Sequence, residues 1–142
     1  MRPRKILSKV DDIHGQHRFE NFGKALLCLK EAVNASTKEP ENYLYTIALA
    51  CTYQFTFQLG WRVLQDCLRY SGVDASLPRD VIKQAFHHGI IKDGEGCITM
   101  LADRNLMAHV YDEKKALAAA ENIRKHYAGA LVQAHLVLKR KL

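Results

Sequence analysis

Apolar residues recur at steps of three and four along most of this 142-residue chain, a spacing typical of helices that bury one face. The first such segment covers about residues 15–34, and its apolar face is made of Phe19, Phe22, Leu26, Leu29 and Val33. The run 34–40, Asn-Ala-Ser-Thr-Lys-Glu-Pro, is expected to end this helix. Residues 1–13 are polar and basic, and we expect them to form a weakly ordered N-terminal arm.

The second segment, about residues 41–70, is apolar over much of its circumference. It carries two apolar stripes, one of which is Leu44, Ala48, Cys51, Phe55, Leu59 and Val63, and the other Phe57, Trp61, Leu64 and Leu68. Between them lies a polar stripe of Gln54, Gln58, Arg62, Gln65 and Arg69. Such a helix is either central in a bundle or packs both inside the bundle and against a second chain. We therefore expect a homodimer.

Start and stop signals delimit the next two helices. Ser76 is the expected N-cap of a short helix with Pro78 in its first turn, where a missing N–H costs nothing. Gly89 is expected to terminate that helix. Asp93 is the expected cap of a further helix that runs to about His109.

The last helix is expected over about residues 113–139, with Asp112 as its cap. No segment alternates with period two for long enough to form a strand, and the chain contains no internal repeat. The predicted fold is all-α, an antiparallel up-down bundle of four long helices and one short helix. Residues 14–142 are expected to form a single domain.

Composition narrows the possible functions. Apolar residues make up 48% of the chain, so it is a folding chain rather than a disordered one. The formal net charge of +6 permits an acidic partner such as RNA, but it is equally well explained by solubility. No signal peptide and no apolar run long enough to span a membrane is found, and the four cysteines form no Cys-x-x-Cys pair. We expect a cytoplasmic protein with free thiols.

Metal and cofactor sites are not expected. His14 and His17, like His87 and His88, form pairs that lack the carboxylate or third ligand that a metal site needs. The chain has no Gly-rich phosphate-binding loop and no serine nucleophile motif.

The stretch 104–111, Arg-Asn-Leu-Met-Ala-His-Val-Tyr, combines polar chemistry with tight spacing. Asn105 and His109 share one helical face, and the long Arg104 side chain can curl toward it. A guanidinium suits a phosphate, and an imidazole can transfer a proton to or from a ribose hydroxyl or a leaving oxygen. Such a pair suits metal-free RNA cleavage. Alternatively, Arg104 pairs with Asp103 or Asp112, and His109 is a hydrogen-bonded histidine between helices.

These residues resemble a known signature. Arg104 and His109 match the R-x4-6-H motif of the HEPN superfamily, and Tyr111 extends it to the R-x4-H-x-Y form of toxins in HEPN–MNT toxin–antitoxin pairs. The blocks that resemble the nucleotidyltransferase-substrate-binding-protein-like family are 18–22, 55–61, 78–86 and 103–106. The resemblance covers about residues 17–127.

The resemblance implies a dimeric helical bundle that brings two motifs to one cleft. It implies a metal-independent ribonuclease in which Arg104 and His109 are catalytic and Asn105 orients them. The partner would be a minimal nucleotidyltransferase (MNT), which in some pairs neutralises the toxin by adding AMP to the motif tyrosine, here Tyr111. The alternative is a non-catalytic subunit of a nucleotidyltransferase that binds a substrate or nucleotide in the same cleft.

One departure concerns the second helix. Related sequences often carry Glu where this chain has Gln54 and Gln58. Together with Asp103, these glutamines are candidates for lining the cleft, and the loss of two carboxylates makes it less acidic.

Overall fold

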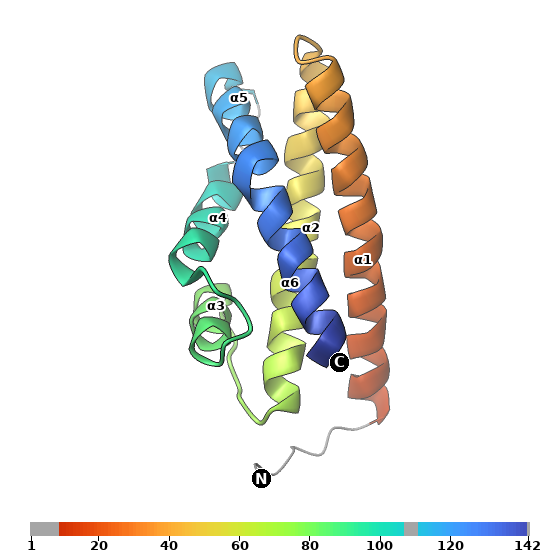
Figure 1. Cartoon of the computed structure of the whole chain (residues 1–142), viewed down its shortest axis with the longest axis vertical. Coiled ribbons are helices and arrows are strands. Elements are labelled where there is room, and N and C mark those ends of the chain that lie inside the picture. The colour runs from red at the N-terminus through yellow and green to blue at the C-terminus, as the bar shows by residue number, and fades with distance from the viewer. Residues whose placement is uncertain (1–8, 107–110, 142) are drawn as a thin grey trace.

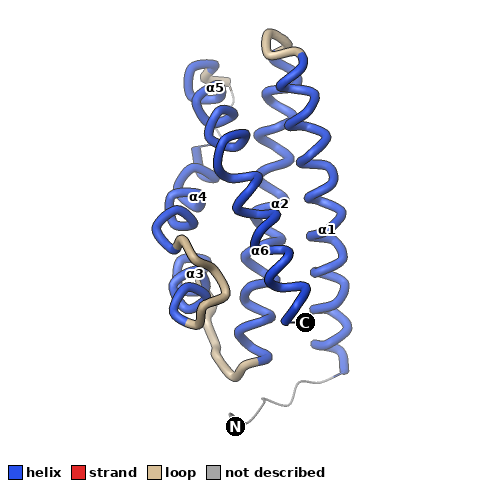
Figure 2. Tube along the Cα trace, viewed as in Figure 1, coloured by secondary structure: helices blue, strands red, loops and turns tan. Residues whose placement is uncertain are grey.

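The computed structural model describes residues 9–106 and 111–141, with side chains placed for 13–104 and 111–141. The elements, all helical, are α1 (Lys9–Lys38), α2 (Tyr43–Tyr70), α3 (Pro78–His87), α4 (Gly94–Leu106), α5 (Glu113–Asn122), a π-helical segment (Ile123–Tyr127) and α6 (Ala128–Lys141). Helix α5, the π segment and α6 follow one another without a break (Figure 1). The predicted all-α up-down bundle is confirmed, since no strand occurs in the described residues (Figure 2).

Helix α1 is longer than predicted at both ends. It begins at Lys9, inside the segment that was expected to be an unstructured arm, and it continues to Lys38. The expected break after residue 34 is wrong. The hydroxyls of Ser36 and Thr37 donate to the carbonyl of Val33, at 3.1 and 2.7 Å, an arrangement that is compatible with helical backbone. The helix ends only near Pro40, which disfavours helical backbone in the residue before it.

Two of the predicted caps at helix starts are confirmed and one is wrong. Asp93 accepts from the Gly96 N–H at 2.9 Å, and Asp112 accepts from the Lys115 N–H at 3.3 Å. Ser76 does not cap α3, because the N-cap position is occupied by Leu77, whose side chain cannot accept a hydrogen bond.

Glycines follow the ends of α2 and α3, and the one after α3, Gly89, was predicted. Gly72 after α2 and Gly89 after α3 have φ of +83° and +74°, a left-handed conformation that residues with a Cβ rarely adopt. Both helices therefore stop where the sequence indicated.

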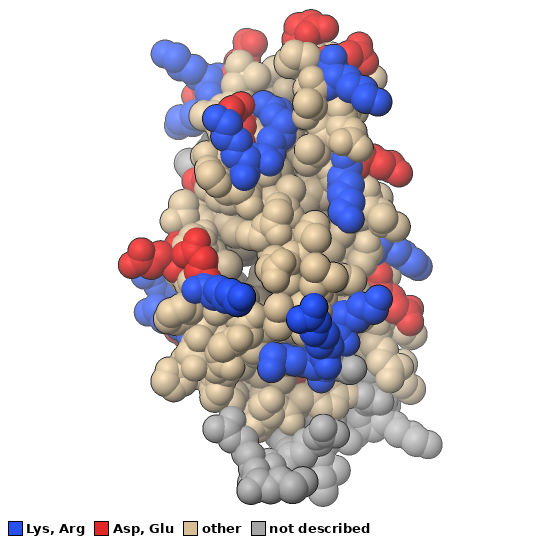
Figure 3. Space-filling model, viewed as in Figure 1, with Lys and Arg blue, Asp and Glu red and all other residues tan. Residues whose placement is uncertain are grey.

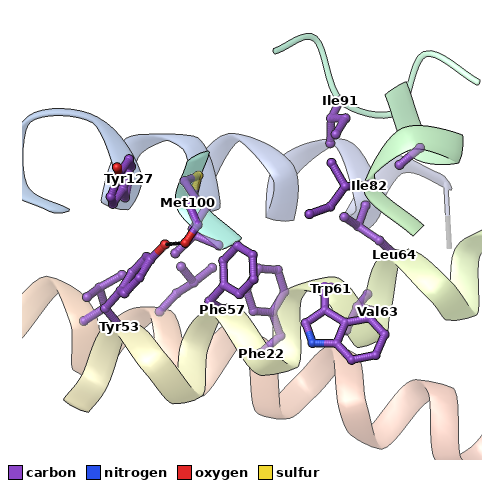
Figure 4. Packing of buried hydrophobic residues seen from close by; sticks show 14 of the residues in the cluster. Phe22, Tyr53, Phe57, Trp61, Val63, Leu64, Ile82, Ile91, Met100 and Tyr127 are labelled. Carbon is purple, nitrogen blue, oxygen red and sulfur yellow. Dashed lines mark hydrogen bonds between the residues drawn. The ribbon is translucent and has the colours of Figure 1, made fainter. Parts of the chain in front are cut away.

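Helix α2 lies at the centre of the bundle and contacts α1, α3, α4, α5 and α6. The second of its two apolar stripes is buried, from Phe57 and Trp61 to Leu68 (Figure 4). At Gly60 the helices approach closely, since a Cβ there would lie 3.2 Å from the Phe22 ring. The predicted central position of this helix is confirmed.

The other apolar stripe of α2 is mostly uncovered in the single chain. Val63 is buried, but Ala48 and Cys51 are exposed, and Leu44 and Phe55 are 73% and 47% exposed. We call Leu44, Ala48, Cys51 and Phe55 the outer stripe. Its exposure agrees with an α2 that has one face inside the bundle and another available to a partner.

In the part of the chain that the structure describes, no helix is both long enough and apolar enough to cross a membrane.

Candidate functional site

Arg104 lies in the last turn of α4, where it is half-buried against α2. Its Nη1 donates a hydrogen bond to Oε1 of Gln58 at 3.3 Å, and Nε2 of Gln54 donates to the Arg104 carbonyl oxygen at 3.4 Å. The guanidinium carbon lies 5.8 Å from the centre of the Phe57 ring. Both glutamines that the sequence suggested as cleft residues therefore contact the motif arginine.

The Gln58 amide is oriented by two donors. Its Oε1 accepts from Arg104 and also from Nε1 of Trp61, at 3.1 Å. Trp61 belongs to the second apolar stripe and is buried, and its indole N–H also orients the side chain of Gln58. A neutral amide holds the guanidinium in place without cancelling its charge, as a carboxylate at position 58 would.

Asp103 on α4 is hydrogen-bonded to the π-helical segment. Its carboxylate accepts a short hydrogen bond from the Tyr127 hydroxyl. Tyr127 is the last residue of the π-helical segment, and its ring stacks on that of Tyr53 with 5.5 Å between centroids. The Tyr53 hydroxyl donates to the Met100 carbonyl oxygen at 2.8 Å (Figure 4). These contacts hold α4 between α2 and the last helix.

Both tyrosines of this cluster stay protonated at neutral pH. Burial raises the pKa of Tyr53 far above its ordinary value, and the carboxylate of Asp103 contributes to the shift. Burial together with the hydrogen bond to Asp103 likewise raises the pKa of Tyr127. Tyr127 therefore acts as a permanent donor to Asp103, next to Arg104. The sequence gave no sign of this hydrogen bond.

The face of α4 that meets α2 contains Met100, which is buried, and Arg104 one turn later. Ala102, three residues before Asn105, is exposed. His109 and the side chain of Asn105 lie outside the described residues, so their place beside Arg104 stays a prediction.

Asp103 and Asp112, which were considered as alternative partners of Arg104, each contact another group. Asp103 accepts from Tyr127, and Asp112 caps α5. Tyr111, the residue before Asp112, is 82% exposed in the turn that leads into α5. It therefore lies on the surface, close in sequence to the motif.

The outer stripe borders the Arg104 site. Gln54 and Gln58 follow Cys51 and Phe55 by three residues each, and residues three apart are neighbours on a helix surface. An apolar, uncovered strip of α2 thus runs directly beside the two glutamines that hold Arg104.

Among the side chains that the structure describes, no group of three His, Cys, Asp or Glu is arranged to hold a metal ion. The rings of His87 and His88 meet edge to face, with 5.4 Å between their centroids. The four cysteines are free thiols.

Comparisons with known proteins identify the relatives of this chain. A protein of Thermus thermophilus of known crystal structure is 29% identical and has a TM-score of 0.76, over 84% of this chain and 99% of that one. No curated protein matches the chain. Residues 17–140 match the family described as nucleotidyltransferase substrate binding protein like, which is part of the HEPN-like superfamily. The chain therefore belongs to the nucleotidyltransferase-substrate-binding-protein-like family.

Proposed function

We propose that this protein is a HEPN-type toxin, a metal-independent ribonuclease that a cognate minimal nucleotidyltransferase neutralises. The observation that carries the proposal is the way in which Arg104 is held. Its guanidinium is half-buried on α4 and hydrogen-bonded to the neutral amide of Gln58, while Gln54 fixes its backbone. A fixed guanidinium binds a phosphate with little loss of side-chain freedom.

In the proposed reaction, the ribose 2′-hydroxyl attacks the adjacent phosphorus and the 5′-oxygen leaves, which gives a 2′,3′-cyclic phosphate. Arg104 would bind the phosphate and stabilise the negative charge that develops on it. His109, five residues further along, would accept the hydroxyl proton or donate a proton to the leaving oxygen. Asn105 would orient this pair.

The outer stripe of α2 is the surface that we propose for the homodimer. Its apolar side chains are too exposed to contribute to the core of one chain, and Phe55 and Leu44 would be covered by a second copy. Because Gln54 and Gln58 border the stripe, a two-fold interface there would bring two Arg104 residues toward one cleft. RNA would bind in that shared cleft.

Tyr111 is the proposed control point. Its 82% exposure makes the phenol accessible to a nucleotidyltransferase. AMP on this hydroxyl would place a phosphate close to the motif, where it would compete with RNA for Arg104 and repel the RNA backbone.

The proposal is tested by expressing the protein in cells with and without the cognate nucleotidyltransferase. We expect growth arrest without the partner and growth with it, while Arg104→Ala and His109→Ala variants are harmless in both cases. Arg79→Ala, which removes an exposed arginine of α3, is the matched control and should stay toxic. Equal growth with the parent chain and with Arg104→Ala, both without the partner, would contradict the proposal.

A second candidate function is favoured by the description of the family. As a non-catalytic subunit, the protein would present a substrate or nucleotide to a bound nucleotidyltransferase, with Arg104 holding its phosphate. This candidate predicts a stable complex with the nucleotidyltransferase, nucleotide binding in calorimetry, and no toxicity. Co-purification without toxicity would favour it over the ribonuclease.

A further inference from the structure

A cavity, here called the hollow, lies at the opposite end of α2 from the outer stripe. It has a volume of about 900 Å³ and is enclosed by the first turns of α1, the last turns of α2, the α3–α4 connection and the end of α6. Leu68 in its wall follows Gln58 by ten residues, or ~15 Å along the helix. The hollow is therefore separate from the Arg104 site.

One wall of the hollow is apolar. Leu68 and Ile90 are buried, and Phe19 is half-buried with its ring stacked on His135 at 4.8 Å. A volume of this size, lined by a rigid aromatic ring and branched aliphatic side chains, is typical of pockets for small organic ligands.

At the floor of the hollow, the negative charge of Asp66 is neutralised by the positive charge of Arg18. Asp66 is 6% exposed, and its two carboxylate oxygens accept from Nε and Nη2 of Arg18 at 2.8 and 3.1 Å. Arg69 approaches the same carboxylate at 3.9 Å. Because Arg18 takes up the charge of Asp66 in a bidentate contact, this buried acid does not make the hollow acidic.

The remaining charge of the lining is positive. Among the described lining residues, Lys139 and Lys141 extend from the end of α6 and outnumber the one other carboxylate, Glu20, which is exposed on α1. Figure 3 shows Lys and Arg side chains gathered over the end of α6. The lining of the hollow thus combines two lysines with apolar side chains.

We propose that this hollow binds a small organic anion, a phosphate or carboxylate carried on an aromatic or apolar body. Lys139 and Lys141 bind the anionic group, and the body lies against Phe19, Leu68 and Ile90. The site is independent of the ribonuclease or substrate-binding role of Arg104, and it gives the bundle a second ligand-binding position.

The experiment is an NMR titration of the full chain with three probes: phenyl phosphate, inorganic phosphate and phenol. The amide signals of Gly15, Ser71 and Ile90, which line or border the hollow, report binding. We expect saturable shifts with phenyl phosphate at concentrations at which the other two probes give little change. In the Lys139→Ala/Lys141→Ala variant, phenyl phosphate should bind about tenfold more weakly.

Lys114→Ala/Lys115→Ala is the matched control, since it removes two exposed lysines from α5 at the other end of the bundle. The phenyl phosphate shifts of Gly15, Ser71 and Ile90 should be the same in this variant and in Arg104→Ala as in the parent chain, which keeps the result separate from that of the proposed function. The proposal is overturned by an absence of saturable shifts, by equal binding of inorganic phosphate, or by an equal loss in the Lys114/Lys115 control.

Discussion

Gln58 meets two donors, the Arg104 guanidinium at 3.3 Å and the Trp61 indole at 3.1 Å. With Glu at this position, the same geometry would give an ion pair, and the guanidinium would be partly neutralised before any phosphate arrives. Even an exposed ion pair stabilises by roughly 0.2–1 kcal/mol. The identity of this one side chain therefore sets how strongly Arg104 attracts an anion.

Gln58→Glu is expected to weaken the binding of a non-cleavable 2′-deoxy oligonucleotide by roughly two- to fivefold. The reason is that the new carboxylate competes with the phosphate for Arg104. Fluorescence anisotropy at fixed salt measures the affinity. Gln84→Glu, which adds the same charge at an exposed position of α3, is the control. An equal loss in both variants would show that only net charge matters.

Tyr127→Phe is expected to lower the free energy of unfolding by about 1–3 kcal/mol at neutral pH, because Asp103 loses a hydrogen-bond donor. Urea denaturation measures the change. Tyr45→Phe, a half-buried tyrosine of α2, is the control and should cost less.

The same tyrosine gives the protein a pH dependence. The folded-state pKa of Tyr127 is raised, so above about pH 10 the unfolded chain releases the phenolic proton while the folded chain retains it. The free energy of unfolding should therefore fall as pH rises above about 10, and less steeply in Tyr127→Phe. Identical slopes for the two proteins would contradict this role of Tyr127.

At the scale of elements, the periodicity of apolar residues predicted α1 and α2, and start and stop signals predicted the other helices of the described residues. The periodicity did not reveal the π-helical segment Ile123–Tyr127. Ile123 and Tyr127 are four residues apart and are buried, and a step of four fits an α-helix as well as a wider turn. The start of α1 was also missed, because Lys9–Ile13 extends the helix beyond the first strongly periodic positions.

One predicted N-cap residue, Asp112, caps its helix and another, Ser76, does not, so the two can be compared by mutation. Asp112→Ala should destabilise the protein by about 1 kcal/mol, because the start of α5 loses its side-chain cap. Ser76→Ala should leave the stability almost unchanged, since Leu77 and not Ser76 occupies the N-cap of α3. Thermal unfolding compares the two variants. A larger loss for Ser76→Ala would contradict the observed start of α3.

At the scale of the whole molecule, the sequence showed the candidate residues but not the contacts between them. Spacing pointed to Arg104 and to the glutamine stripe of α2 separately. Their meeting depends on how α4 packs on α2, and so on the Tyr53, Met100 and Tyr127 contacts between distant segments. No local pattern encodes such long-range pairs.

The outer stripe of α2 leads to a prediction about the oligomeric state of the protein. If the chain forms the proposed dimer, Phe55→Lys should shift it to a monomer, because a charge in the middle of the proposed apolar interface would be buried without a partner. Sedimentation velocity at micromolar concentration measures the mass. Leu77→Lys, at a position 64% exposed before α3, should leave the dimer intact. A parent chain that sediments as a monomer would exclude the proposed shared cleft.

Cleavage of RNA by the purified chain in the presence of EDTA tests the central claim most directly. The Arg104 site predicts fragments that end in a 2′,3′-cyclic phosphate, detected by mass spectrometry, and their loss in Arg104→Ala and His109→Ala but not in Arg79→Ala. RNA that stays intact with the dimeric parent chain, or fragments that appear equally with Arg104→Ala, would contradict it.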